Sequence, residues 1–71
     1  MCYIATNIRY LRTKKGLSQM ELCELIGFSH DMVWKWESGR CNPSLEAILI
    51  LCRVLGVTYD ELIGEDLEHG K

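Results

Sequence analysis

Helix-starting and helix-stopping residues divide this chain into short segments. Within each segment apolar residues recur at the spacing of an α-helix, and glycines or polar residues separate one segment from the next. Ser18 with Glu21, and Thr58 with Glu61, match the capping box, in which each residue's side chain bonds to the backbone amide of the other. Because the local signals agree at every joint, they predict an all-α fold of five helices with a definite packing.

The same signals give the expected ranges. We expect helices over about residues 3–15, 19–26, 30–38 and 45–55, and a fifth helix that begins after Thr58. Ser29 and Ser44 are the expected N-caps of the third and fourth helices, since serine is favoured at that position. The second and third helices are short, and a tight turn over residues 27–29 is expected to join them.

Apolar side chains at helical spacing mark the expected core faces. In chain order they are Ile4, Ile8 and Leu11; Met20, Leu22, Cys23 and Ile26; Val33 and Trp36; Leu45, Ile48, Leu51, Cys52 and Leu55; and Leu62 and Ile63. A chain of 71 residues offers enough apolar surface for one core. We therefore expect a single domain over residues 1–71, with its core in about 4–63 and an acidic tail, 64–71, that frays.

Four cysteines have spacings that fit neither a zinc site nor a disulfide framework: Cys2, Cys23, Cys41 and Cys52. We expect free thiols, with Cys23 and Cys52 in the core and Cys2 and Cys41 exposed. No metal and no cofactor are predicted. The sequence shows no signal peptide and no apolar run of membrane-spanning length, so a cytoplasmic protein without a membrane partner is expected.

Charge is distributed unevenly along the chain. The net charge of −2 argues by itself against a nucleic-acid binder, because phosphate contacts need Lys and Arg. Residues 1–40, however, carry a net charge of +2 and residues 41–71 a net charge of −4. One end of the molecule can therefore face DNA while the other end is acidic.

The stretch from Gly16 to Ile63 contains several specific sequence motifs. They are GLSQ at 16–19, Gly27, WESGR at 36–40, PSLE at 43–46 and LGVTYDEL at 55–62. With these motifs, residues 4–63 closely resemble the Cro/repressor-type (XRE-like) helix-turn-helix family. The resemblance implies a compact five-helix, lambda-repressor-like DNA-binding domain, in which the second and third helices form the helix-turn-helix and the third enters the major groove.

The resemblance also implies roles for individual residues. Base contacts are expected from the outward side chains at the start of the third helix: His30, Asp31, Trp34 and Lys35. Phosphate contacts are expected from Ser18, Gln19, Ser29, Arg40, Asn42 and Ser44. Arg12 and Glu37 are expected to form a partly buried ion pair that joins the first helix to the third.

A structural interpretation stands beside several of these roles. His30 and Lys35 can belong to a solvated helix face, and Arg40 can be a free surface charge. Asp31 can be an acid favoured by the helix dipole as well as an acceptor from cytosine N4. Trp34 can contact a thymine methyl group, or it can bind a protein, because a large exposed aromatic side chain needs a partner.

The favoured function is that of a transcriptional regulator that binds double-stranded DNA sequence-specifically. We expect a repressor that acts as a homodimer on a palindromic operator. The expected dimer surface is the helix that begins after Thr58 together with the exposed parts of the helix over residues 45–55. The main alternative is a helix-turn-helix used for protein binding, as in an antitoxin-like adaptor, which the acidic balance, Asp31 and Trp34 favour. An enzyme is disfavoured, because Cys2 and Cys41 lack a partner histidine in any catalytic motif and no phosphate-binding loop is present.

Overall fold

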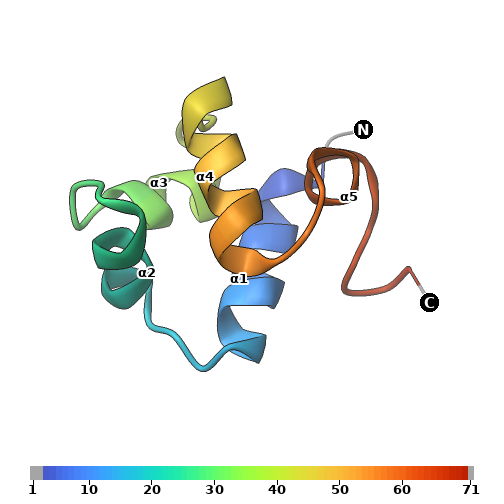
Figure 1. Cartoon of the computed structure of the whole chain (residues 1–71), viewed down its shortest axis with the longest axis horizontal. Coiled ribbons are helices and arrows are strands. Elements are labelled where there is room, and N and C mark those ends of the chain that lie inside the picture. The colour runs from blue at the N-terminus through green and yellow to red at the C-terminus, as the bar shows by residue number, and fades with distance from the viewer. Residues whose placement is uncertain (1–2, 71) are drawn as a thin grey trace.

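The computed structural model describes residues 3–70, and within that range the chain forms five α-helices and no strand (Figure 1). The helices are α1 (Ile4–Lys14), α2 (Gln19–Ile26), α3 (Met32–Ser38), α4 (Leu45–Leu55) and α5 (Tyr59–Gly64). The prediction of five helices is confirmed, and α2, α4 and α5 begin at the predicted residues. None of the helices in residues 3–70 is long and apolar enough to cross a membrane.

Side-chain caps fix the beginnings of three helices. The Ser18 hydroxyl accepts a hydrogen bond from the Glu21 amide at 3.0 Å, and the Glu21 carboxylate accepts one from the Ser18 amide at 2.7 Å. Thr58 and Glu61 make the same reciprocal pair at the start of α5. The Ser44 hydroxyl accepts from the Ala47 amide at 3.2 Å and caps α4. These bonds satisfy amides that have no partner inside their helix.

The beginning of α3 differs from the prediction. The helix starts at Met32, its N-cap is Asp31, and no side chain caps it. Ser29 contributes only its backbone carbonyl, which accepts from the Met32 amide at 3.0 Å. The connection between α2 and α3 therefore covers residues 27–31 instead of 27–29. Gly27 leads into it with φ = 79°, a left-handed conformation that is strained for residues with a Cβ atom.

The core lies where the inner faces of the five helices meet. It contains Ile4, Ile8, Leu22, Cys23, Ile26, Val33, Trp36, Ala47, Ile48, Leu51, Cys52, Leu55 and Leu62. Trp36 is its largest side chain, and the ring of Phe28 packs edge-on against it with 5.4 Å between centroids. Two predicted core residues are wrong, because Met20 and Leu45 lie in the first turns of their helices with their side chains mostly in solvent.

One buried polar side chain joins α1 to the end of α5 and the segment after it, which lie on the same side of the molecule as the start of α1 (Figure 1). Asn7 on α1 is fully buried, and its amide group donates to the carbonyls of Leu62 at 2.8 Å and Glu65 at 2.6 Å. Its side-chain oxygen accepts from the Leu67 amide at 3.1 Å. The sequence did not predict these contacts. They give the segment after α5 a fixed attachment point, while fraying of residues 64–71 stays a prediction.

Cys23, Cys41 and Cys52 are free thiols, and Cys23 and Cys52 are buried as predicted. The prediction that Cys41 is exposed is wrong, because its side chain is half-buried against the core. Cys23 also bonds across the α2–α3 turn, because its sulfur accepts from the Val33 amide at 3.5 Å. Burial raises the pKa of the Cys52 thiol above its ordinary value, and the negative charge of Glu61 raises it further. Cys2 lies outside the described residues.

Candidate nucleic-acid interface

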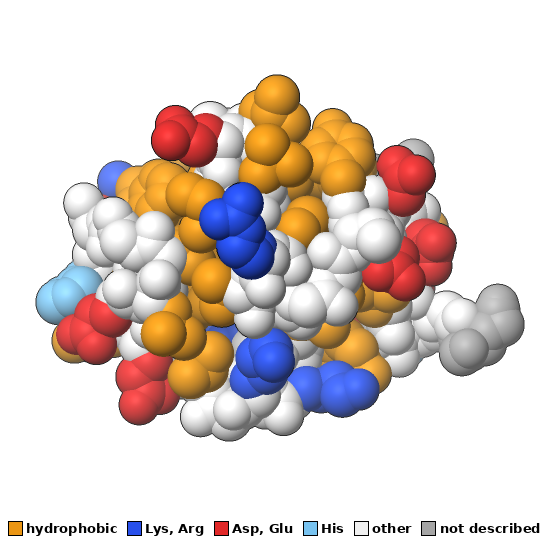
Figure 2. Space-filling view, in the orientation of Figure 1, with side chains coloured by type: hydrophobic (Ala, Val, Ile, Leu, Met, Phe, Trp, Pro, Cys, Tyr) orange, Lys and Arg blue, Asp and Glu red, His pale blue; other side chains and the backbone are white. Residues whose placement is uncertain are grey.

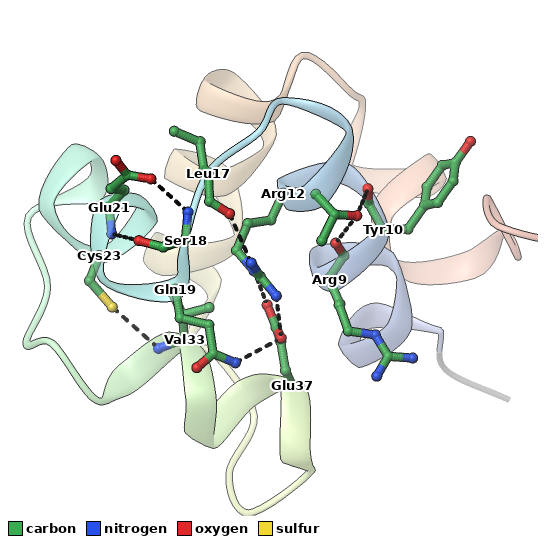
Figure 3. A network of polar contacts seen from close by, with 11 residues as sticks. Arg9, Tyr10, Arg12, Leu17, Ser18, Gln19, Glu21, Cys23, Val33 and Glu37 are labelled. Carbon is green, nitrogen blue, oxygen red and sulfur yellow. Dashed lines mark hydrogen bonds and ion pairs between the residues drawn. The ribbon is translucent and has the colours of Figure 1, made fainter.

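An ion pair between Arg12 and Glu37 joins α1 to α3, as predicted. The Arg12 Nε atom lies 2.7 Å from Glu37 Oε2, and Arg12 Nη2 lies 3.1 Å from Glu37 Oε1 (Figure 3). The two side chains are only 12% and 6% exposed. Arg12 Nη1 also donates to the Leu17 carbonyl at 2.8 Å, so the guanidinium fixes the loop before α2 as well.

Gln19, the first residue of α2, completes this network. Its side-chain amide donates to Glu37 Oε1 at 2.9 Å, so Glu37 receives hydrogen bonds from both α1 and α2 (Figure 3). The three helices therefore meet at one carboxylate. This contact holds the Gln19 side chain in one orientation beside the outer face of α3.

The outer face of α3 and the turn before it display the four expected base-contact residues. His30, Asp31 and Trp34 are exposed and Lys35 is half-buried. The Lys35 Nζ atom lies 3.2 Å from Asp31 Oδ2, one helical turn away. His30 Nε2 lies 3.6 Å from Glu24 Oε2 on α2. Lys35 and His30 thus each lie next to a carboxylate on the same surface.

Trp34 and Arg40 form a second pair on this surface. The Arg40 guanidinium carbon lies 5.1 Å from the centre of the Trp34 ring, within the range of a cation–π interaction. The Trp34 side chain is nevertheless 44% exposed. Neither residue is therefore isolated: Arg40 covers one part of the indole and leaves the rest open to a binding partner.

A depression of about 260 Å³ lies between α1, α2 and α3. It is lined by Arg9, Arg12, Gln19, Trp34, Glu37 and Ser38. Arg9 was not among the predicted site residues, although its position three residues before Arg12 places both arginines on one face of α1. The Arg9 side chain is exposed and points away from the Arg12–Glu37 network (Figure 3).

The remaining predicted phosphate contacts lie in four places. Ser29 is exposed in the turn before α3, and Asn42 is exposed in the loop after it. Ser18 and Ser44 are exposed at the starts of α2 and α4, where each hydroxyl oxygen accepts a backbone amide. A hydroxyl that accepts such a bond still has its own proton to donate.

The face of the molecule in Figure 2 is mixed in charge. Lys and Arg side chains lie near the end of α1 and over α4, and Asp and Glu side chains lie beside α5 and also over α2. The candidate interface combines its basic residues with the carboxylates of Asp31 and Glu37. The surface is therefore mixed in charge, and its positive charges are those of Arg9, Lys35 and Arg40 beside these carboxylates.

A family model described as a helix-turn-helix domain matches residues 4–63, which include α1, α2, α3 and α4 and most of α5. The chain belongs to the helix-turn-helix domain family. In this helix-turn-helix, α2 is the first helix, residues 27–31 form the turn, and α3 is the second helix.

Relatives of the helix-turn-helix chain include proteins of different regulatory types. The antitoxin PezA of Streptococcus pneumoniae is 35% identical over 63 residues, which cover 89% of this chain and 40% of PezA. The transcriptional activator BcrR of Enterococcus faecalis is 39% identical over 61 residues, which cover 84% of this chain and 30% of BcrR. The chain therefore spans less than half the length of these two relatives.

A solved structure of the Cro/repressor type has the same fold. The P22 c2 repressor, crystallised in complex with a synthetic operator, matches with a TM-score of 0.81 and 28% identity, covering 86% of this chain and 92% of the repressor chain. The predicted resemblance to Cro/repressor-type helix-turn-helix proteins and the lambda-repressor-like fold are both confirmed.

Proposed function

We propose that this helix-turn-helix protein is a transcriptional regulator, acting as a repressor, that binds double-stranded DNA sequence-specifically and places α3 in the major groove. The observation that carries the proposal is the outer surface of α3 and its preceding turn, where His30, Asp31, Trp34 and Lys35 offer donors, acceptors and an apolar ring. The family membership and the repressor-like fold support it.

Phosphate contacts on both sides of α3 would fix the protein on the duplex. On the α2 side, Gln19, Arg9 and the free hydroxyl proton of Ser18 are available to phosphate oxygens. On the other side, Arg40, Asn42 and Ser44 follow α3, and Ser29 precedes it. These groups position the recognition helix and carry no sequence information themselves.

A homodimer on a palindromic operator is part of the proposal. One helix of this length reads few base pairs, so two copies are needed for a long site. Exposed apolar side chains on α4 and α5 support a dimer surface there: Leu45, Leu49 and Tyr59. Placement in the cytoplasm follows from the proposed role in transcription.

Binding to another protein is the second candidate function. The exposed part of Trp34, the net negative charge and the relationship to the antitoxin PezA favour it. In this case the same face of α3 would contact an apolar or basic surface of a partner protein. DNA binding releases counterions and weakens steeply with salt, whereas an aromatic protein interface does not.

Selection of bound duplexes from a random DNA pool tests the proposal, followed by fluorescence anisotropy of the best duplex at two salt concentrations. A palindromic consensus whose affinity falls steeply with salt is the expected result. A folded protein that enriches no sequence would overturn the proposal in favour of protein binding.

A pair of variants on α2 tests the positioning role of Gln19. Gln19→Ala should weaken binding to all DNA sequences alike, by about 5-fold for one lost hydrogen bond. Met20→Ala, at the next and mostly exposed position, is the matched control and should leave the affinity unchanged. A changed consensus in Gln19→Ala would contradict a purely positioning role.

A further inference from the structure

We propose that Asp31 and Lys35 act as one unit that reads a single G·C base pair in the major groove. The inference rests on the proposed DNA-binding function of α3 and gives it a defined base-pair contact. The Lys35 Nζ atom lies 3.2 Å from Asp31 Oδ2, and the two side chains are 41% and 58% exposed. The pair is therefore preformed and open to a ligand.

Both side chains keep free hydrogen-bonding capacity within this ion pair. A lysine ammonium has three donors, so two remain when one points to Asp31. A carboxylate has two oxygens, and Asp31 makes no side-chain bond to the backbone at the start of α3. The pair thus presents two donors beside one acceptor.

The edge of a G·C pair has the complementary pattern. Guanine N7 and O6 are adjacent acceptors in the major groove, and cytosine N4, next to O6, is a donor. O6 and N4 are Watson–Crick partners, so about 2.7–3.2 Å separates them. The distance of 3.2 Å between Lys35 Nζ and Asp31 Oδ2 is of the same size, so the two groups can approach O6 and N4 side by side.

An A·T pair satisfies the unit less well. Its adenine N6 donor is flanked by one acceptor on each side, and the thymine methyl group lies next to O4. One ammonium donor of Lys35 would then be desolvated without a partner, which is unfavourable. The observed ion pair also removes an electrostatic conflict, since Asp31 alone would be repelled by phosphates, whereas the pair has no net charge.

Selections from random duplexes with the wild-type chain, Asp31→Ala and Lys35→Ala test the pairing. The wild type should select G·C at one position of each half-site. Both variants should lose the preference at that same position, keep it elsewhere, and bind the wild-type consensus about 5- to 100-fold more weakly. Asp60→Ala, which removes an exposed carboxylate from α5, is the matched control and should keep the wild-type consensus.

Base analogues in the consensus duplex test the contact without changing the protein. Inosine keeps the major-groove edge of guanine and should bind like guanine. Replacing the guanine with 7-deazaguanine, or the cytosine with N4-methylcytosine, should weaken wild-type binding measured by anisotropy. Lys35→Ala should be insensitive to 7-deazaguanine, and Asp31→Ala should be insensitive to N4-methylcytosine.

The outcomes separate this inference from the proposed function. If the two variants lose preference at different positions, at none, or at a position that is not G·C, the inference is wrong while DNA binding by α3 stands. The inference would also be overturned if neither 7-deazaguanine nor N4-methylcytosine lowered the affinity of the wild type. A selection that enriches no sequence would overturn the proposed function and the inference with it.

Discussion

Glu37 is the residue on which three helices depend. It accepts hydrogen bonds from Arg12 on α1 and Gln19 on α2 while it belongs to α3, and its side chain is almost fully buried. A buried carboxylate is stable only because these donors replace its water shell. The same residue therefore determines the packing of α1 and the orientation of a proposed phosphate contact.

Glu37→Ala should lower the free energy of unfolding by about 3–5 kcal/mol, because it leaves the Arg12 guanidinium buried without a carboxylate. The double variant Arg12→Met/Glu37→Leu should lose much less, since no unpaired charge remains. Urea denaturation followed by circular dichroism measures both. Equal losses in the single and double variants would show that the burial of an unpaired charge is not the cause.

Cys52 makes the free energy of unfolding depend on pH in the alkaline range. Burial, with Glu61 as the smaller cause, raises its pKa in the folded chain above the ordinary value of 9.0. The folded state then holds the thiol proton more tightly than the unfolded state, so this contribution to stability is present below pH 9.0 and is lost as the pH rises above it. Urea denaturation between pH 8 and 10 should show a shallower decline for Cys52→Ala than for the wild type. Cys41→Ala, which keeps Cys52, is the control and should follow the wild type.

At the scale of the helix, local sequence predicts some boundaries and not others. Ser18, Ser44 and Thr58 were recognised correctly because a cap and its amide partner lie three residues apart, so the signal is local. Ser29 is also a serine, but its side chain does not cap α3, because the chain makes a turn through His30 and Asp31 before α3 begins. The packing of the turn against the core decides this, and no local pattern encodes it.

Two serines give a matched test of capping. Ser44→Ala should lower the free energy of unfolding by about 0.5–2 kcal/mol, since the Ala47 amide loses its partner. Ser29→Ala should change it by less than about 0.5 kcal/mol, as for an ordinary surface position. Thermal or urea denaturation of both variants checks this. A similar loss in Ser29→Ala would mean that Ser29 has a structural role outside capping.

Whole-molecule contacts were the least accessible from the sequence. The Arg12–Glu37 pair was expected only because the family resemblance supplied it, and Arg9 was missed because its place in the depression depends on how α1 packs against α2 and α3. Asn7 gave no signal at all, since an asparagine in a helix is usually exposed. Its partners lie more than 50 positions away in the chain and become visible only in the folded structure.

Asn7→Ala should lower the free energy of unfolding by about 1–3 kcal/mol, because the buried carbonyl of Leu62 loses its hydrogen-bond donor. It should also release the Leu67 amide, so hydrogen exchange at Leu67 should become faster than in the wild type. Thr6→Ala, on the neighbouring exposed position of α1, is the control and should leave the exchange at Leu67 unchanged. Slow exchange at Leu67 in Asn7→Ala would show that the segment after α5 is held by other contacts.

The two tryptophans are intrinsic fluorescent reporters in different environments. Trp36 is 2% exposed in the core, whereas Trp34 is 44% exposed on the outer face of α3, so a small quencher such as acrylamide reaches only the second in the folded chain. Unfolding would expose Trp36 and raise the quenchable fraction. Occupation of the recognition face, by DNA or by protein, would cover Trp34 and lower it. Emission from the unlabelled protein can therefore report unfolding and ligand binding as opposite changes in the quenchable fraction.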